Sequence, residues 1–542
     1  MKLELLMKIP QRNELEGLVD YAQRLSELYS RIYSPETRKH RGQFFTPHQV
    51  STFMANLFEI HKDTIRLLDP GAGTGILSAA FCERLLSNDK IVNLTMDVYE
   101  NDKNILPFLK MTLESCKIEL AKRGCNVDYN IFEQDYILRN KSYFTKSDLV
   151  WANENHILYD FIISNPPYYK LNADSPQSTV MGGLISGQPN IYALFMSLSA
   201  SMLKPDGEMV FITPRSFCSG LYYKKFREWF IKNIQITNIH IFESRKEIFD
   251  QDEVLQENII IKAKKLKTIE KSQKVVISES KNKHFDKLSK LEVEARDVIF
   301  RKNGDIFIRI PTSPLDIEIL HVVDSWPNTL KELGLEISTG PVVSFRAEEY
   351  LLPELTETPK SVPLLWMHNM KDMRVILSLH KDKKPSAIRV CSETKQLLLP
   401  VKNYVLVKRF SSKEQKRRLY ASVLLESEFP YKTVGIENHV NYIHKPGADL
   451  SVYEAFGIAS ILNTSIVDKF FRTLNGNTQV NATDIRSLPF PDIEDIRKIG
   501  KFIYESKSYK NGLDLDKTVS EILGINVEIQ NLVKGEIKNE SN

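Results

Sequence analysis

Cysteine is scarce in this chain of 542 residues, and its distribution excludes two kinds of structure. The five cysteines are an odd number, lie far apart and include no CxxC pair. That distribution argues against a disulfide framework and against a structural zinc site. No acidic cluster has metal-ligand spacing either, so we expect no metal site. A reducing compartment suits such a chain, and we expect it to be cytoplasmic.

Long hydrophobic runs are also missing. The N-terminal stretch MKLELLMKIPQRNELEG has no long apolar run followed by small residues, so we expect no signal peptide. No segment reaches the roughly 18 apolar residues of a membrane span, and we expect no membrane association. Charge excludes little, because a net charge of +4 with 26% charged residues fits many enzymes. The length allows two or three domains.

Strand-like and helix-like segments alternate between residues 64 and 265. We expect strands at 64–69, 94–100, 127–135, 159–164, 208–214, 236–243 and 257–265, and helices at 76–86, 105–120, 191–203 and 223–233. This alternation predicts an α/β fold, a mostly parallel sheet covered by helices. The last strands follow one another without a helix between them, which predicts an antiparallel edge.

Composition divides the chain further. Residues 1–40 form an N-terminal segment with apolar side chains at helical spacing over 13–33. The alternating region, 41–265, is the expected catalytic domain. A lysine-rich, poorly periodic stretch at 266–325 marks a boundary region. Residues 326–491 combine short strands with many turns and predict a second, mixed α+β domain, and 492–542 form a C-terminal tail.

A glycine-rich turn, DPGAGTG at 69–75, follows the first strand and opens a helix. Glycines let the backbone turn sharply and approach a ligand closely. Glu100 ends the next strand, where a carboxylate can accept both ribose hydroxyls of a nucleoside. A dinucleotide is one candidate ligand, but the motif is not GxGxxG and suits S-adenosylmethionine, which has no pyrophosphate. The alternative is an ordinary glycine turn beside an unrelated Glu.

Asp135 follows the third strand. Its carboxylate could accept a hydrogen bond from an adenine amine, or it could simply cap a helix.

The tetrapeptide NPPY at 165–168 ends a buried strand with two prolines, which cannot continue it. The Asn165 side-chain oxygen and the Pro166 carbonyl are two neutral acceptors that can bind both hydrogens of a planar NH2 group. Such binding favours rehybridisation of that nitrogen and exposes its lone pair. Tyr168 offers a flat face on which a base can stack. A plain strand-ending turn is the alternative.

The order of these motifs resembles the gamma-class adenine-N6 DNA methyltransferases of bacterial type II restriction–modification systems. The resemblance rests on GQFFTP at 42–47, DPGAGTG, Glu100, Asp135, NPPY and the long C-terminal region, and it covers roughly 41–265. It implies a Rossmann-like S-adenosylmethionine-dependent methyltransferase sheet followed by a mixed α+β target-recognition domain. The implied reaction is methyl transfer to adenine N6 in a specific sequence of double-stranded DNA, with the target base flipped into the pocket.

The resemblance also implies roles for individual residues. Along the cofactor it places Phe45, Thr46, Pro47, Asp69, Gly71, Ala72 and Gly73, with Glu100 on the ribose, Asp135 on the adenine and Phe195 packed on its ring. Phe195 could equally be a core helix residue. Phe249 resembles an aromatic that contacts the flipped base. The insertion at 172–188 has no fixed family pattern; it could touch DNA, close the site or remain a solvated loop.

The second domain is the expected reader of the DNA sequence, because base edges must be read in a groove. The candidate readers are Arg346, Lys408, Arg409, Lys416, Arg417, Arg418, His439 and His444. Each could instead belong to a solvated face or contact phosphate. Residues 476–491 resemble the closing segment of target-recognition regions.

Two other functions remain open at this point. NPPY also suits a glutamine amide in a protein, and a methyltransferase fold can serve as a non-catalytic DNA-binding module. We expect a monomer whose cognate restriction endonuclease is a separate protein, since about 40 residues before GQFFTP are too few for a nuclease domain.

Overall fold

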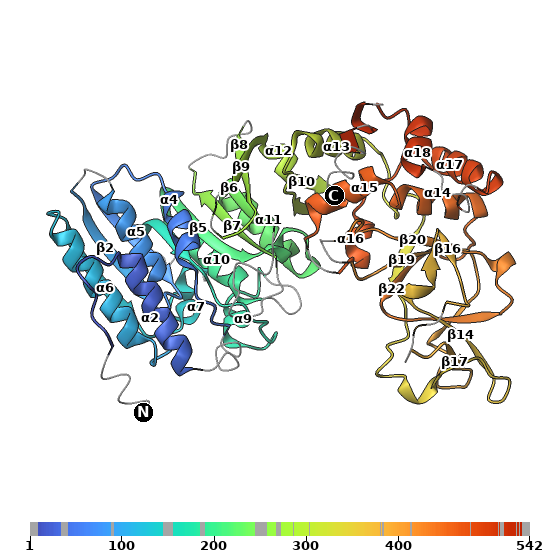
Figure 1. Cartoon of the computed structure of the whole chain (residues 1–542), viewed down its shortest axis with the longest axis horizontal. Helices are drawn as coiled ribbons and strands as arrows, with labels where there is room; N and C mark the ends of the chain where they lie inside the picture. The colour runs from blue at the N-terminus through green and yellow to red at the C-terminus, as the bar shows by residue number, and fades with distance from the viewer. Residues whose placement is uncertain are drawn as a thin grey trace. The chain divides into compact units, whose positions relative to one another are not determined.

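A computed structural model describes residues 9–33, 42–87, 91–144, 156–184, 190–243, 257–266, 273–283, 285, 287–302, 304–379, 381, 384–411, 415–476, 479–507, 509, 514–526, 528–530 and 532–533. The chain forms two compact units, residues 1–312 and 313–542 (Figure 1). None of the helices in the described ranges has the length and apolarity needed to cross a bilayer.

The first unit is built on a nine-stranded sheet of order β3-β2-β1-β4-β5-β7-β6-β8-β9. Its strands are β1 (Thr64–Pro70), β2 (Asn93–Tyr99), β3 (Asn126–Phe132), β4 (Tyr159–Ser164), β5 (Leu203–Pro214), β6 (Gln235–Phe242), β7 (Asn258–Lys264), β8 (Lys274–Ser280) and β9 (Leu288–Glu294). Strands β1 to β5 pair in parallel, and β7 lies antiparallel between β5 and β6. The predicted α/β class and the antiparallel edge are therefore confirmed.

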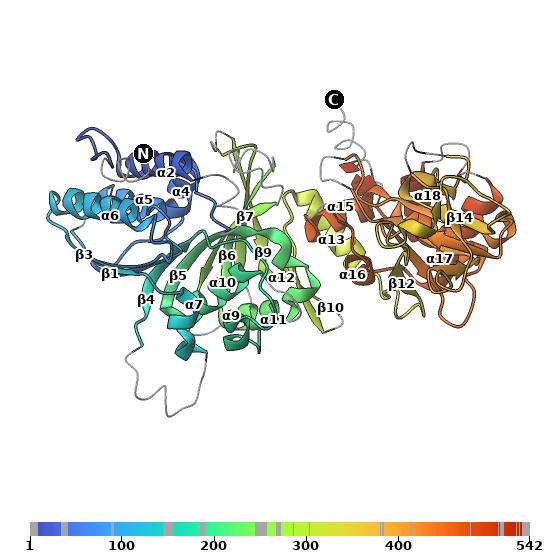
Figure 2. The same cartoon turned by 90° about the horizontal axis from the view of Figure 1, so that it is seen from below.

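Helices cover both faces of this sheet, as the second view makes clear (Figure 2). One layer holds α2 (Leu18–Ile32), α4 (His48–Asn56), α5 (Ile76–Leu86) and α6 (Leu106–Ala121). The other holds α7 (Tyr136–Arg139), α9 (Pro176–Val180), α10 (Ile191–Met202) and α11 (Lys224–Asn233). The central strand β4 is buried at every position, which a strand covered on both faces requires.

Two segments that the sequence analysis set apart from the catalytic domain pack with the nine-stranded sheet and its helices. Helix α2, in the N-terminal segment that we set apart, packs against α5 and α6 within the sheet's helical layer. Strands β8 and β9 lie in the lysine-rich boundary stretch yet extend the sheet at its edge. An edge strand keeps exposed charged residues, and β9 exposes most of its side chains, so its apolar pattern is weak. After β9 come α12 (Ala295–Val298) and a hairpin of β10 (Ile299–Lys302) and β11 (Asp305–Ile308).

The second unit combines two small sheets with helices. The six-stranded sheet has the order β12 (Glu336–Thr339), β22 (Val440–His444), β19 (Tyr404–Lys408), β20 (Ala421–Leu424), β16 (Arg374–Val375) and β15 (Met370–Lys371). The five-stranded sheet has the order β13 (Leu351–Leu352), β17 (Ala387–Arg389), β14 (Ser361–Leu365), β21 (Thr433–Ile436) and β18 (Leu398–Pro400). The expected mixed α+β character is confirmed.

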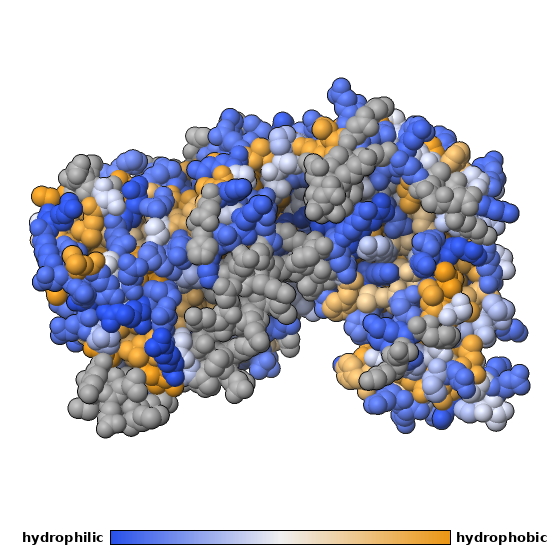
Figure 3. All heavy atoms as spheres, viewed as in Figure 1, coloured by the Kyte–Doolittle hydropathy of each residue, from blue (hydrophilic) through white to orange (hydrophobic). Residues whose placement is uncertain are grey.

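The helices of this unit are α13 (Pro314–Asp324), α14 (Val452–Leu462), α15 (Ser465–Leu474), α16 (Ala482–Arg486), α17 (Ile493–Glu505) and α18 (Leu515–Leu523). Helix α17, from the stretch that we took as a tail, packs closely on α14. Glycines permit that approach, because a Cβ on Gly500 would lie 1.7 Å from the Tyr453 carbonyl oxygen. On the face in Figure 3 hydrophilic residues predominate, and hydrophobic ones form small separate patches. The domain boundaries drawn from composition stay a prediction.

Candidate functional site

The carboxyl ends of β1, β2, β3 and β4 meet at one edge of the sheet, beside a cavity of about 770 Å³. The chain leaves β1 toward β2 on one side, whereas β4 lies on the other side of β1. Such a reversal of strand order is where open α/β sheets bind ligands. The cavity is lined by Gly42, Gln43, Phe44, Phe45, Gly71, Gly73, Tyr99, Glu100, Asn101, Asp102, Lys103, Asn104, Ile105, Gln134, Asp135, Tyr136, Asn165, Pro167, Tyr169, Ile191 and Phe195.

The glycine turn forms one wall because its backbone adopts conformations that side chains disfavour. Gly71, Gly73 and Gly75 have φ angles of +80°, +57° and +85°. The amides of Gly71 and Ala72 both donate to the Tyr99 carbonyl at 2.9 Å, which fixes the turn against the end of β2. A Cβ on Gly71 or Gly73 would project toward Phe195 or Phe45, at 3.6 and 3.5 Å. Glycine therefore keeps this part of the cavity open.

Two buried carboxylates lie beside this turn. The Glu100 carboxylate accepts hydrogen bonds from the amides of Gly73 at 3.0 Å and Asp102 at 2.8 Å, and burial raises its pKa to about 7. Those two bonds leave other lone-pair positions of the carboxylate for a ligand. Asp69 is fully buried outside the cavity lining and accepts from the Ser78 hydroxyl at 2.7 Å. Burial raises the pKa of Asp69 to about 7 as well, with the nearby Glu100 adding to the shift.

A third carboxylate, Asp102, was missed by the sequence analysis. It lines the cavity and accepts hydrogen bonds from the Tyr29 hydroxyl at 2.7 Å, the Gln43 amide at 3.2 Å and Asn104. Burial opposes ionisation, but the bonds from Tyr29, Asn104 and Gln43 lower the pKa of Asp102 overall. Asp102 therefore stays charged more readily than Glu100 or Asp69. Only its position two residues beyond Glu100 could have indicated it.

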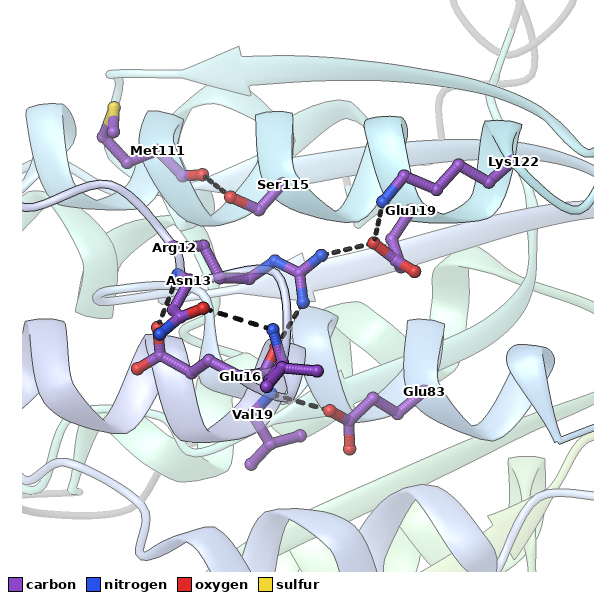
Figure 4. A network of polar contacts seen from close by, with 10 residues as sticks. Arg12, Asn13, Glu16, Val19, Glu83, Met111, Ser115, Glu119 and Lys122 are labelled. Atoms are coloured by element: carbon purple, nitrogen blue, oxygen red, sulfur yellow. Dashed lines mark hydrogen bonds and ion pairs between the residues drawn. The ribbon is translucent and has the colours of Figure 1, made fainter.

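The N-terminal helix α2 is part of the site. Its Ser26 hydroxyl lies 2.6 Å from the Thr74 hydroxyl of the glycine turn, and its Tyr29 ring meets Phe45 edge-on at 5.6 Å. Figure 4 shows how the segment before α2 is held: the Arg12 guanidinium bridges Glu119 of α6 and the Glu16 carbonyl. Close by, Glu83 of α5 accepts from the Val19 amide at 3.1 Å. These bonds fix α2 against the helices that flank the glycine turn.

Asp135 caps a helix, which was one of its two expected roles, and its role toward an adenine amine stays a prediction. One carboxylate oxygen caps α7 by accepting from the Leu138 amide at 2.9 Å, and the other accepts from the Gln177 side chain at 2.9 Å. Gln177 belongs to α9 in the insertion, whose residues 185–188 lie outside the described part. Phe195 projects from α10 into the cavity wall, 5.0 Å from the Tyr136 ring. Phe195 thus lines the cavity while also packing as a core residue.

The side chain of Asn165 is oriented by the GQFFTP loop. Its amide nitrogen donates to the Phe44 carbonyl at 2.8 Å and to the Thr46 hydroxyl at 3.0 Å. Both amide hydrogens therefore have acceptors, which fixes the side-chain oxygen as the accepting end of the group. Thr46 is buried and does not line the cavity, which it reaches through its hydrogen bond with Asn165.

Tyr168 is more enclosed than the sequence suggests. Its hydroxyl lies 2.6 Å from the Asn165 oxygen and 2.9 Å from the Ile212 carbonyl, two acceptors for one hydrogen. Its ring stacks on Phe44 at 5.6 Å and meets Tyr192 edge-on at 6.4 Å. Only 8% of the residue is exposed. A base could stack on the face of Tyr168 that Phe44 covers only if Phe44 moved.

The structure brings most of the predicted site residues together. Those that line the cavity are Phe45, Gly71, Gly73, Glu100, Asp135, Asn165 and Phe195. The residues that are not part of the lining are Thr46, Pro47, Asp69, Ala72, Pro166 and Tyr168, the last of which hydrogen-bonds to Asn165. Phe249 lies outside the described residues. The role of each residue toward a ligand stays a prediction.

The candidate DNA readers of the second unit lie in different surroundings. Arg346, Arg409 and His439 lie in loops at one end of the six-stranded sheet, beside the end of β19 where Lys408 stands. Arg418, by contrast, is fully buried, where it donates to the Ser411 hydroxyl and the Asn475 carbonyl.

Three further candidates lie elsewhere in the second unit. Arg417 donates to the Asn463 carbonyl. His444 stacks on Tyr442 at the opposite end of β22. Lys416 is exposed beside Arg417.

Comparison with known proteins places the chain in a family. The sequence model of the Eco57I restriction-modification methylase family matches residues 75–249. Type II methyltransferase M.PstI of Providencia stuartii is 36% identical over 85% of this chain and 89% of its own length, and type II methyltransferase M.BsuBI of Bacillus subtilis is 34% identical over 90% and 95%. Among solved structures, the type IIG restriction endonuclease BpuSI has a TM-score of 0.44 at 12% identity and covers 97% of this chain and 69% of its own. The chain belongs to the type II methyltransferases of restriction–modification systems.

Proposed function

We propose that this protein transfers a methyl group from S-adenosylmethionine to adenine N6 within a specific sequence of double-stranded DNA. The modification would protect host DNA from a separate, cognate restriction endonuclease. The observation that carries this proposal is the orientation of Asn165. Because Phe44 and Thr46 engage both of its amide hydrogens, its oxygen is held as an acceptor beside the cavity.

The charges of the cavity lining suit S-adenosylmethionine better than a dinucleotide. The lining contains three carboxylates, those of Glu100, Asp102 and Asp135, and one lysine, Lys103. A pyrophosphate would be repelled by this surplus of negative charge, whereas a ligand with a sulfonium and an ammonium group would be attracted. Glu100 would accept the ribose hydroxyls, and Asp135 would lie at the adenine beside Phe195. When bound, S-adenosylmethionine supplies an electrophilic methyl group on sulfur.

The residues of NPPY would then act on the attacking amine. The Asn165 oxygen and the Pro166 carbonyl would accept its two hydrogens, which directs the nitrogen lone pair toward the methyl group. Both acceptors are held in advance, so little reorganisation accompanies the reaction. The Tyr168 hydroxyl occupies the Asn165 oxygen, but the Ile212 carbonyl offers it a second acceptor 2.9 Å away. Tyr168 can therefore release Asn165 to the amine without losing its own hydrogen bond.

Expression in a host that lacks DNA methylation, followed by sequencing that detects modified bases, tests the proposal. We expect N6-methyladenine within one short recurring motif. N4-methylcytosine would retain the amine chemistry and overturn the choice of adenine. Unmodified DNA from cells that contain the folded protein would overturn the DNA substrate, and mass spectrometry of methylated proteins would then test a glutamine amide as the acceptor.

A further inference from the structure

Three loops of the second unit emerge together at one end of its six-stranded sheet. The register pairs Thr339 of β12 and Val407 of β19 with the same residue of β22, Asn441. The loop after β12, the turn before β22 and the segment after β19 must therefore lie side by side. This sheet end carries Arg346, His439 and Arg409 on those three segments.

The loop after β12 is held rigidly on both sides of its tip. The Gly340 amide donates to the Val440 carbonyl at 2.8 Å, and the Val342 amide donates to the Ile436 carbonyl at 3.1 Å. Beyond the tip, the Ala347 amide donates a hydrogen bond to the Val343 carbonyl at 3.1 Å. Val342 and Ala347 are both buried. Only the residues between these anchors project, so their side chains are presented on a preformed backbone.

The tip of this loop presents an aromatic side chain to solvent. Phe345 is 74% exposed, and the Arg346 guanidinium lies 5.4 Å from its ring centre. Isolated exposed hydrophobic residues are common and need no explanation by themselves. Phe345 differs because it stands on a pinned loop, where its position is fixed before any partner binds and little ordering cost remains to be met on binding.

The neighbours of this loop favour a polyanion as the partner. The Arg409 guanidinium donates to the carbonyl of Asn438, which in turn donates its amide to the Val342 carbonyl of the loop. The Nε of Arg409 is buried without a hydrogen-bond partner among the described residues. Next to it, Phe410 packs on the partly exposed His439 at 4.8 Å. The exposed carboxylates Glu348 and Glu349 follow the loop and limit the cationic surface on that side.

We propose that Phe345 stacks on a base of the target duplex, while Arg346 and Arg409 bind the adjacent phosphates. The proposal rests on the proposed function, since it names a residue that contacts the DNA substrate. Apolar side chains that enter DNA insert between neighbouring bases and partly unstack them, and a flipped target base leaves base faces exposed. Phe345 would supply stacking energy, and the two arginines the salt-dependent attraction.

The test measures how tightly Phe345→Ala, Phe345→Leu, Phe345→Trp and the wild-type protein bind a duplex that carries the motif in which the enzyme methylates DNA. Stacking is worth enough that we expect Phe345→Ala to weaken binding by roughly tenfold or more. Phe345→Trp should bind nearly as the wild type does, and Phe345→Leu should resemble the alanine variant because it lacks a flat face. Phe502→Ala is the matched control, an exposed phenylalanine of the same unit on α17 (49% exposed), and should leave binding unchanged.

Duplexes with single abasic positions across the motif locate the stacked base. At that position the abasic change and Phe345→Ala should not weaken binding additively, since each removes the same contact. Unchanged binding by Phe345→Ala, equal binding by Phe345→Leu and the wild type, or additive losses at every position would each overturn the inference. A wild-type protein that leaves DNA unmodified would overturn the proposed function, and this inference with it. A methylating enzyme that is indifferent to Phe345 would overturn this inference alone.

Discussion

Binding of S-adenosylmethionine should strengthen as the pH rises from 6 to 7.5, and Glu100 is the reason. Burial raises the pKa of this carboxyl group to about 7 in the absence of a ligand. Ribose hydroxyls that donate to Glu100 favour its ionised form, so the bound state should release the proton that the free protein holds. Cofactor binding near neutral pH is therefore coupled to deprotonation.

The magnitude follows from the ionised fraction of Glu100. With a pKa of about 7, roughly one tenth of the free protein has this group ionised at pH 6 and about three quarters at pH 7.5. If only the ionised form binds, affinity should rise about eightfold over this range. The folded free protein holds more protons here than the unfolded chain, so the Glu100 contribution makes its own stability fall as pH rises from about 4.5 to 7. Stabilisation by the cofactor should grow over the upper part of the same interval.

Isothermal titration calorimetry at several pH values, in buffers of different ionisation enthalpy, measures both the affinity and the protons released. We expect release of most of one proton at pH 6.5. The α-amino group of the cofactor itself titrates near pH 8, which sets the upper limit of the range. Glu100→Gln keeps the size of the side chain and removes its titration, so it should bind more weakly and with a flatter pH profile. A wild-type affinity that is constant from pH 6 to 7.5, or an equal slope in Glu100→Gln, would refute the reasoning.

Three further variants probe the site and the fold. Asn165→Ala should keep the cofactor dissociation constant within about twofold and lower kcat at least a hundredfold, because a preorganised acceptor is lost; full turnover would contradict its role. Tyr29→Phe removes the 2.7 Å hydrogen bond to Asp102 and should weaken cofactor binding by about 1 kcal/mol in calorimetry, and unchanged binding would exclude Asp102 from the cofactor site. Gly500→Ala places a Cβ 1.7 Å from the Tyr453 carbonyl oxygen and should lower the free energy of unfolding by at least about 2 kcal/mol. The control Lys501→Ala changes an exposed neighbour and should leave the free energy of unfolding unchanged. Equal melting temperatures of Gly500→Ala and the wild type would show that α14 and α17 can separate without cost.

The sequence predicts the strands of the central sheet because they are short segments rich in apolar residues that alternate with helical segments. β4, with six buried residues, ends at the proline pair as expected. Strands β8 and β9 were not predicted, because their apolar residues are interrupted by lysine, glutamate and serine. Strand β8 takes its place in the sheet by pairing with β6, and β9 by pairing with β8; no local pattern encodes the pairing of β8 with β6.

In the site, too, residues with a local sequence signal could be predicted, whereas contacts between residues far apart in the sequence could not. Gly71, Glu100 and Asn165 could be predicted because each stands at the end of a recognisable strand. The hydrogen bonds that Tyr29 and Thr46 make within the site could not, since they join residues that are 73 and 119 positions apart. A single side-chain bond over such a separation leaves no periodicity in the sequence. It becomes visible only when helix α2 and the GQFFTP loop are folded onto the strand ends.

Burial decides which cationic residues of the second unit can contact DNA. Near neighbours in the sequence differ in burial, since Lys416 is exposed and Arg418 is buried. Arg418 is fully buried, and its guanidinium donates hydrogen bonds to the Ser411 hydroxyl and the Asn475 carbonyl. Substituting it would disturb folding before it could report on DNA. Arg346 is exposed on a pinned loop, so its substitution should change DNA affinity and the salt dependence of binding without changing the melting temperature. A mutational search for the sequence-reading surface should therefore begin at the sheet end that carries Arg346 and Arg409, because the exposure of Arg346 lets a loss of binding be separated from a loss of fold.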